Sequence, residues 1–361
     1  MSHPSRILLV GPLAESGRPA VGGYESANLR VLALLRQICP DTSAFPYPRA
    51  TGNPLAKGAQ YLTAFVRLLW QLISTQGDNA AVHFTPLCRH FLGAESLIAC
   101  AARMKGYRLV LDLRAGMQES WYRKSSFLYR WVFRRLLSLA TTITFEGEPY
   151  EPWLESLRPG SRRFWLPNFV ASTMLRKRDS VSEPFSPRLV YVGAVSEAKG
   201  ANAALLVLQL LRAQYPDATL TLIGRCDSRF LDVMKSADAA GVELTGPLTE
   251  AAMQTHLDAS HFFLFLSAWF GEGHSNALTE AMARGCVPIV SRQGFSESVV
   301  GEAELVMPDR DDAAAIAAAI EAIWEKGAWP DLSDRMVSRV AEHFTDRQAL
   351  AVLEQVYGEG T

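Results

Sequence analysis

The sequence predicts an α/β protein of two domains, each built around a doubly wound parallel sheet. The apolar run Arg6–Val10 is followed by a loop with two adjacent glycines and a helical pattern over Tyr24–Gln37. A strand, a glycine turn and a helix in that order start a doubly wound domain. The same order recurs where the strand Arg188–Gly193 and the turn Ala194–Gly200 precede a helix that runs to about residue 215. A chain of 361 residues has the length for about two such domains.

The other elements are predicted from apolar runs of strand length and from helical spacing of apolar residues. In the first half we expect helices at 55–74, 91–104, 121–139 and 149–157, and strands at 81–84, 108–113, 142–145 and 164–170. In the second half we expect strands at 218–224, 242–244, 261–266 and 286–290, and helices at 277–284, 311–324 and 343–357. Residues 171–187 are charged, contain Ser and Pro and lack periodicity, which indicates a linker.

The composition predicts a globular protein of a reducing compartment. Hydrophobic residues make up 48% of the chain, too many for a disordered protein. The five cysteines are odd in number and scattered, so we expect buried thiols rather than disulfides or a metal site. The apolar run before Gly11 is too short for a signal peptide, and no run approaches the roughly twenty apolar residues of a spanning helix. We therefore expect a cytoplasmic protein that is soluble or peripheral on a membrane.

The net charge of −1 conceals a strong asymmetry between the two halves of the chain. Residues 1–170 hold 20 Lys and Arg against 11 Asp and Glu, a balance of +9. Residues 171–361 hold 16 against 26, a balance of −10. Such a split indicates that the first half faces an anionic partner, either nucleic acid or an acidic membrane surface.

The segment Trp121–Leu139 combines basic and aromatic side chains and has no acidic residue. Its tryptophans and cations are Trp121, Arg123, Lys124, Arg130, Trp131, Arg134 and Arg135. A basic amphipathic helix with aromatic side chains is suited to the headgroup layer of a membrane, and we favour this interpretation. Two others remain: the aromatics pack on the sheet while the arginines are solvated, or the helix binds nucleic acid. No accompanying motif supports the last, so we expect no nucleic-acid partner.

The stretch from Trp269 to Gly301 is the strongest candidate for a binding site. A glycine-punctuated loop precedes a helix that Ser275 or Asn276 can cap, and Gly285 is placed to end that helix. The unpaired amides and the dipole at such a helix start suit a phosphate group. Two carboxylates, Glu272 in the loop and Glu280 inside the helix, can face one ligand there. The alternative is an ordinary helix start with solvated carboxylates.

The segment from Glu272 to Glu280, EGHSNALTE, followed by AMARGCVPIV, resembles the Glu-x7-Glu signature of the retaining glycosyltransferases of family 4. The resemblance implies the GT-B fold, in which two Rossmann-like domains face each other across a cleft. It also implies that the first glutamate faces the donor sugar and the second holds the nucleotide ribose. Because the last helix of relatives crosses back, it implies a first domain of residues 1–170 plus about 344–361. The donor-binding domain would then be 188–343, after the linker 171–187.

Further donor-site residues follow from the same resemblance. The segment VGAVSEAKG, which ends in Lys199 and Gly200, is similar to a family motif whose Arg and Lys both neutralise the donor diphosphate. Lys199 matches, but Ala194 stands at the Arg position, and Arg225, Arg114 or Arg292 are the candidates to substitute. The expected donor-binding residues besides Glu280 are Gly193, Arg225, Gly273, His274, Ser275, Asn276 and Gly294.

The first half has two candidate ligand contacts. In relatives, a glycine pair such as Gly22-Gly23 approaches the donor diphosphate or the acceptor, although a flexible loop explains the pair equally well. Arg114 follows the strand 108–113, where many relatives have His-Gly. It supplies a fixed cation for phosphate or an acidic acceptor at the carboxyl end of a parallel strand.

Taken together, the resemblance and the charge pattern predict a retaining glycosyltransferase that needs neither a metal nor a cofactor. Lys199 and Glu272 are the expected catalytic residues, and a UDP- or GDP-sugar is the expected donor. We expect a saccharide or lipid-linked acceptor in cell-surface polysaccharide or glycolipid synthesis, at the inner face of the cell membrane. The alternatives are a glycosyltransferase-like scaffold subunit without turnover, which Ala194 would explain, and a sugar phosphorylase.

Overall fold

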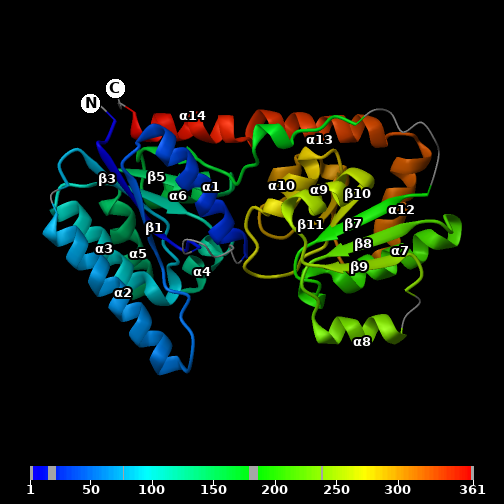
Figure 1. Cartoon of the computed structure of the whole chain (residues 1–361), viewed down its shortest axis with the longest axis horizontal. Coiled ribbons are helices and arrows are strands. Elements are labelled where there is room, and N and C mark those ends of the chain that lie inside the picture. The colour runs from blue at the N-terminus through cyan, green and yellow to red at the C-terminus, as the bar shows by residue number, and fades with distance from the viewer. Residues whose placement is uncertain (1–2, 15–21, 76, 179–185, 237–238, 359–361) are drawn as a thin grey trace. The chain divides into compact units, whose positions relative to one another are not determined.

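The chain divides into two compact units (Figure 1) in the computed structural model, which describes residues 3–14, 22–75, 77–178, 186–236 and 239–358. Unit 1 consists of Met1–Phe169 and Asp346–Thr361, and unit 2 is Val170–Thr345. Residues 179–185 of the predicted linker and residues 359–361 at the end of the predicted first domain lie outside the described residues.

Unit 1 is built on a six-stranded parallel sheet of order β2-β1-β3-β4-β5-β6. Its strands are β1 (Arg6–Gly11), β2 (Thr42–Pro46), β3 (Ala80–Phe84), β4 (Arg108–Leu113), β5 (Thr142–Phe145) and β6 (Arg163–Trp165). Its α-helices are α1 (Gly22–Ile38), α2 (Pro54–Ser74), α3 (Leu92–Met104), α4 (Gln118–Lys124), α5 (Phe127–Leu139), α6 (Tyr150–Leu157) and α14 (Asp346–Tyr357). A 3-10 turn, η1 (Arg89–Phe91), precedes α3. The central strands are buried along their length, as expected when helices cover both faces of a parallel sheet.

The last helix, α14, completes the core of unit 1. Leu353 and Tyr357 of α14 are fully buried and pack with Leu35 of α1 and Leu9 of β1 in one apolar cluster. Arg108 of β4 also donates to the carbonyl of Tyr357 over 3.2 Å. The end of the chain is therefore part of the unit formed by its beginning.

Unit 2 repeats the architecture with a parallel sheet of order β12-β11-β10-β7-β8-β9. Its strands are β7 (Arg188–Val192), β8 (Thr219–Ile223), β9 (Val242–Gly246), β10 (Phe262–Phe265), β11 (Val287–Ser291) and β12 (Val306–Met307). Its α-helices are α7 (Ala201–Gln214), α8 (Ser228–Ser236), α9 (Glu250–Ala259), α10 (Asn276–Ala283), α11 (Ser296–Val300), α12 (Ala313–Glu325) and α13 (Trp329–His343). The 3-10 turns are η2 (Ser172–Met174), η3 (Glu197–Lys199) and η4 (Ala303–Leu305).

Two predicted helices are wrong in their boundaries. The predicted helix 121–139 is broken between α4 and α5, because the hydroxyl of Ser126 accepts from the amide of Tyr129 and caps a new helix there. The predicted helix from 343 is preceded by α13, which ends before the buried ring of Phe344, and α14 begins only at Asp346. The predicted strand 164–170 is also shorter, since β6 ends at Trp165.

Candidate functional site

The predicted donor-site residues of unit 2 lie at the carboxyl ends of its parallel strands. Gly193 follows β7, Arg225 follows β8, and the loop that contains Glu272 follows β10. Because β10, β7 and β8 are neighbours in the sheet, these segments meet along one edge. Ligands bind at this edge in open parallel sheets. The edge is therefore the candidate site.

Lys199 and Glu272 form an ion pair at this edge. Lys199 Nζ lies 2.7 Å from Glu272 Oε2, and their side chains are 25% and 9% exposed. The Ser267 hydroxyl donates to the same carboxylate oxygen over 2.7 Å. The indole ring of Trp269 lies under the ammonium group, with Nζ 4.2 Å from the ring centroid. The structure thus brings the two predicted catalytic residues together, with the Lys199 side chain partly exposed.

The turn that carries Lys199 is clamped to the end of β10. Gly200 adopts φ +89°, and a Cβ there would lie 2.2 Å from the carbonyl oxygen of Leu266, so only glycine fits. The guanidinium of Arg310 donates to the carbonyls of Glu197 and Leu266 over 3.0 and 3.3 Å. These contacts fix the backbone on both sides of the ion pair.

The loop before α10 is fixed in a similar way by the loop after β11. Gly294 has φ +61°, and a Cβ there would lie 2.6 Å from the carbonyl oxygen of Glu272. The side-chain amide of Gln293 donates to the carbonyl of Trp269 over 3.0 Å. Ser291 Oγ donates to the carbonyl of Ser267 over 2.6 Å. The position of Glu272 is therefore set by backbone contacts as well as by its ion pair.

The start of α10 is capped as predicted, by one of the two candidate residues, Ser275 and Asn276. Ser275 is the cap, because its hydroxyl accepts from the amide of Leu278, and Asn276 is the first helical residue. His274 is buried, with Nε2 2.7 Å from the Thr279 hydroxyl and its ring edge-on to Phe344. Glu280 lies one turn into the helix and is 7% exposed. Gly285 has the predicted left-handed conformation at φ +74°.

Arg225 lies beside the position that lacks the expected arginine. The amide of Val195, next to Ala194, donates to the carbonyl of Arg225 over 2.9 Å. Ala194 is exposed, and the Arg225 side chain is exposed without a partner among the described residues. Gly224 has φ +138°, and a Cβ there would lie 1.8 Å from the carbonyl oxygen of Gly193, so the two strand ends touch here. By contrast, Arg292 lies 3.6 Å from Glu297.

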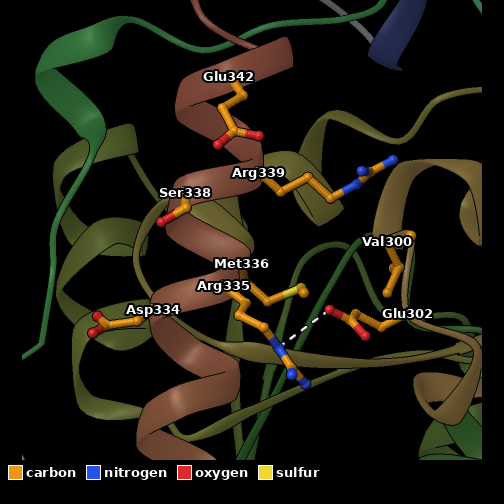
Figure 2. Close-up of a pocket in the computed structure, with 9 residues that line it drawn as sticks. Val300, Glu302, Asp334, Arg335, Met336, Ser338, Arg339 and Glu342 are labelled. Carbon is orange, nitrogen blue, oxygen red and sulfur yellow. Dashed lines mark ion pairs between the residues drawn. The ribbon is translucent and has the colours of Figure 1, made fainter.

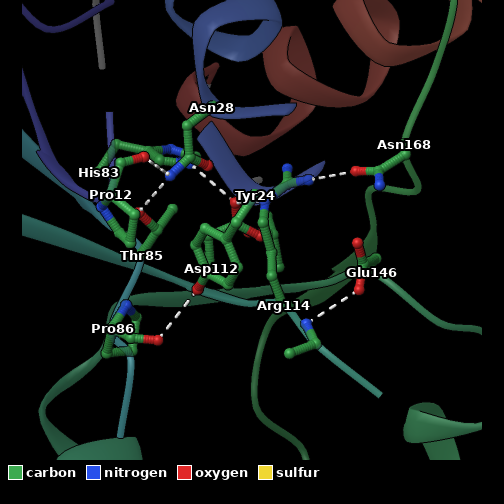
Figure 3. Close-up of polar contacts among 12 residues, drawn as sticks. Pro12, Tyr24, Asn28, His83, Thr85, Pro86, Asp112, Arg114, Glu146 and Asn168 are labelled. Carbon is green, nitrogen blue, oxygen red and sulfur yellow. Dashed lines mark hydrogen bonds and ion pairs between the residues drawn. The ribbon is translucent and has the colours of Figure 1, made fainter. Parts of the chain in front are cut away.

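Arg114 is at the corresponding edge of unit 1 but is buried in a polar cluster (Figure 3). Its side chain is 1% exposed, and it donates to Asp112 over 2.6 Å and to Asn168 over 2.7 Å. Although burial opposes ionisation, Arg114 and His83 hold the pKa of Asp112 down at about 2. A contact of Arg114 with a phosphate or an acidic acceptor therefore requires this cluster to rearrange.

The glycine pair predicted to approach a ligand starts a helix. Gly22 and Gly23 are the first residues of α1, and Gly22 has φ +81°. A Cβ on Gly22 would meet no atom within 4 Å among the described residues, so its conformation rather than close packing requires glycine. The loop before it, residues 15–21, lies outside the described residues.

A strained turn follows β3 at the same edge of unit 1. Cys88 and Arg89 both have positive φ, +56° and +52°, which is costly for residues with a Cβ. The buried carboxylate of Glu95 accepts from the amides of Leu87 and Cys88, each over 2.8 Å, and from the Tyr47 hydroxyl. Burial raises the pKa of Glu95 to about 7, although these hydrogen bonds oppose the rise.

A cavity of about 330 Å³ lies elsewhere in unit 2, between α13 and the turn after α11 (Figure 2). Its lining includes Arg335, which is paired with Glu302 over 3.2 Å. None of the predicted site residues lines it. Arg339, which also lines it, donates to the carbonyls of Val299 and Ser298, and we assign the cavity no role.

Four contacts of the site could not be predicted. Ser267 and Trp269 lie five and three residues before Glu272, but neither residue type signals a role. Tyr191 lies in β7, and its pKa is raised by burial and by the nearby Glu272 carboxylate. Arg310 is far from Lys199 in sequence, so nothing local indicates that it holds the Lys199 turn.

The chain is similar to known proteins in part of its sequence and in its fold. Residues 186–326 match the family described as Glycosyl transferases group 1. Anabaena HepE, solved in complex with UDP, is 12% identical, with a TM-score of 0.69 over 97% of this chain and 99% of that chain. A glycosyltransferase from Rickettsia africae is 12% identical, with a TM-score of 0.68 over 98% of each chain.

The pneumococcal O-GlcNAc transferase GtfA, solved with UDP and GlcNAc, is 15% identical, with a TM-score of 0.62 over 81% of this chain and 59% of that chain. No curated protein matches the chain significantly. The structural likenesses show a GT-B fold with two Rossmann-like domains, which confirms the predicted α/β class.

Glu95 gives a prediction for the pH dependence of stability. Its pKa is about 7 in the folded protein against 4.5 as its ordinary value, so the folded state favours the protonated form. Its contribution to stability is present at low pH and is lost as the pH rises towards 7. We expect Glu95→Gln, which cannot titrate, to be more destabilising at pH 5 than at pH 8, by about 2 kcal/mol.

Urea unfolding followed by circular dichroism at both pH values measures this difference. Glu148→Gln, which removes an exposed carboxylate from the same unit, is the matched control. An equal cost of Glu95→Gln at pH 5 and pH 8 would show that the carboxylate titrates alike in the folded and unfolded chains.

Proposed function

We propose that this protein is a retaining glycosyltransferase that moves a sugar from a nucleoside diphosphate donor to a saccharide or lipid-linked acceptor. The observation that carries the proposal is the Lys199–Glu272 pair at the carboxyl edge of the sheet of unit 2. The group 1 match over residues 186–326 includes both residues. The UDP in the structures of Anabaena HepE and pneumococcal GtfA supports a nucleotide-sugar donor. The nucleotide of the proposed donor is UDP or GDP.

Each residue has a role that its position allows. The ammonium of Lys199 stabilises the leaving diphosphate, together with the amides at the start of α10. Glu272 accepts hydrogen bonds from the donor sugar, and Glu280 accepts them from the ribose. The bond between the anomeric carbon and the phosphate oxygen breaks as the acceptor oxygen attacks from the same face. The acceptor proton passes to the leaving phosphate, so the step needs no protein nucleophile and no metal.

The ion pair also explains how both charges are stabilised when no donor is bound. Without a ligand, Lys199 and Glu272 compensate each other's charge, which lowers the cost of holding either in a partly buried place. A bound diphosphate would bring its negative charge to the partly exposed Lys199. The Glu272 carboxylate then turns from a counter-ion into an acceptor for sugar hydroxyls.

Arg225 is proposed to replace the cation that Ala194 lacks. Its backbone is bonded to the residue next to Ala194, and its side chain is exposed. Of the other two candidates, Arg114 is buried against Asp112 and Arg292 lies near Glu297. If Arg225 does not act, Ala194 favours the second candidate function, a glycosyltransferase-like scaffold that binds donor without turnover.

The acceptor is proposed to be presented at a membrane, at the inner face of the cell membrane, in cell-surface polysaccharide or glycolipid synthesis. The support is the exposure of Arg130, Arg134 and Arg135 on α5, together with the exposed ring of Trp131. Trp121, predicted for the same surface, instead lies under the guanidinium of Arg89. No described helix is both long and apolar enough to cross a bilayer.

The central test is nucleotide-dependent stabilisation, measured as a thermal shift with UDP, GDP, ADP and their sugars. A donor present at 100 times its dissociation constant adds about 2.7 kcal/mol to the free energy of unfolding. We expect Lys199→Ala to lower kcat/KM about 100-fold to 1,000-fold, the loss typical of one group that stabilises a developing negative charge. Lys235→Ala, an exposed lysine of α8, is the control. No shift with any of these nucleotides in the wild type would refute the proposal.

A rescue experiment tests Arg225. We expect Arg225→Ala to weaken nucleotide binding and to lower kcat, because a cation near the diphosphate is lost. Adding Ala194→Arg to the Arg225→Ala variant should raise its nucleotide affinity again by about 10-fold or more, because a cation returns to the neighbouring strand end. Isothermal titration with the nucleotide that stabilises the wild type measures binding. Full activity of Arg225→Ala excludes a role for Arg225.

Membrane association is tested by sedimentation with vesicles rich in phosphatidylglycerol at low salt. Each basic side chain near an anionic surface contributes about 1 kcal/mol, so replacing Arg130, Arg134 and Arg135 with Ala should weaken binding roughly 100-fold. The matched control replaces Arg229, Arg335 and Arg347, three exposed arginines on other elements. Equal losses in both triple variants would mean that only net charge matters.

A further inference from the structure

Helix α2 presents an apolar stripe to solvent along its whole length. Leu55, Leu62, Val66, Trp70 and Ile73 are 86%, 65%, 57%, 72% and 47% exposed. Their spacing of seven, four, four and three residues keeps them on one side of the helix. From the first to the last, the stripe is about 27 Å long at 1.5 Å per residue.

The opposite side of α2 packs on its unit, where the rings of Tyr61 and Phe65 contact Phe91 and Phe65 also contacts Tyr47. Leu68 and Leu72, in the C-terminal half, are its buried residues. The N-terminal half extends past the helices beside it (Figure 1). An apolar stripe of this length that is left open to solvent indicates an interaction surface.

The two neighbouring helices continue the same apolar surface. On α3, which packs between α2 and α5, Leu97 and Met104 are 67% and 80% exposed. On α5, Phe127, Leu128 and Trp131 are exposed as well. Together, α2, α3 and α5 hold ten of the seventeen large exposed hydrophobic side chains among the described residues. We call these ten side chains the three-helix face.

The exposed charges on the three helices themselves are of one sign. Neither α2 nor α5 contains an acidic residue, and the single carboxylate of α3, Glu95, is fully buried. The exposed cations of the three helices are Lys57, Arg67, Arg103, Arg130, Arg134 and Arg135. A partner for this surface must therefore be apolar where it meets the stripe and anionic around it.

We propose that the three-helix face docks on an anionic lipid bilayer, with the α2 stripe lying in the boundary between headgroups and acyl chains. The proposal deepens the proposed membrane association, on which it rests, by making α2 the inserted element. The arginines of α5 then contact headgroups at the surface. A helix with a large apolar stripe and basic flanks takes this orientation in the interface.

A second copy of the chain fits the surface less well. A symmetric interface would pair the three-helix face with itself and would bring its cations against the same cations of the other copy. Like charges set opposite each other oppose association, whereas anionic headgroups attract them. The charge pattern therefore selects the bilayer.

The test compares two matched double substitutions in the full-length protein. Leu62→Glu with Val66→Glu places two carboxylates in the α2 stripe. Leu206→Glu with Leu210→Glu does the same to an exposed pair of equal spacing on α7 of unit 2. With vesicles of phosphatidylglycerol and phosphatidylcholine, we expect the α2 variant to bind at least about 10-fold more weakly than wild type and the α7 variant to bind normally.

A second measurement reports the depth of α2. Lipids brominated in the acyl chains should quench part of the tryptophan fluorescence, and Trp70→Phe should remove most of the quenched fraction. Binding of the α2 variant equal to that of wild type, or quenching unchanged by Trp70→Phe, would overturn the proposal. So would analytical ultracentrifugation that finds a wild-type dimer, without vesicle binding, which the α2 substitutions convert to a monomer.

The nucleotide thermal shift separates this proposal from the proposed function. The α2 variant should keep the shift of the wild type, because its substitutions are in unit 1 and Lys199 and Glu272 are in unit 2. Vesicle binding without any nucleotide response would leave the docking surface standing and remove the transferase. A nucleotide response without vesicle binding would support the transferase and refute the docking surface.

Discussion

The arrangement of the candidate site depends on one ion pair, between Lys199 and Glu272. The two residues come from different strand ends of unit 2, so the pair joins the turn after β7 to the loop after β10. Ser267 and Trp269 hold the pair from one loop, and Arg310 fixes the turn that carries the lysine. A cation that is held in place before a phosphate arrives needs little reorganisation when the negative charge develops.

The same constraint explains why glycine recurs at this edge. At Gly200 and Gly294 a side chain would strike a carbonyl oxygen of the opposing segment, at Leu266 and Glu272 respectively. Both have left-handed backbones, so a larger residue would be strained even without the clash. The loops can thus pack closely enough for short side chains such as Ser267 to reach the ion pair. The position of the Lys199–Glu272 pair therefore depends on glycine at 200 and 294, where a side chain would clash.

The sequence predicted the parts of this site that are local. The pattern of strand, glycine turn and helix predicted the turn in which the family resemblance singled out Lys199. The helix start predicted a cap at Ser275 or Asn276, because its signals lie within a few residues. The contacts of Arg310 and Gly294 join segments far apart in the chain, and no local pattern records them. In unit 1, the cation predicted at Arg114 was correctly placed at a strand end. Its burial depends on Asp112 and Asn168, which only the folded sheet brings to it.

The break between α4 and α5 shows how a local misreading changes a functional argument. Taken as one helix, residues 121–139 put Trp121 and Trp131 on a common amphipathic element. The cap at Ser126 separates them, and Trp121 stacks with Arg89 while Trp131 stays exposed. The basic surface therefore cannot rely on one continuous helix for its apolar part. In the proposed docking, α2 contributes five exposed apolar side chains and no carboxylate, in addition to the exposed apolar side chains of α5. Insertion by α2 and headgroup contact by α5 are thus separable, and ionic strength should weaken the second far more than the first.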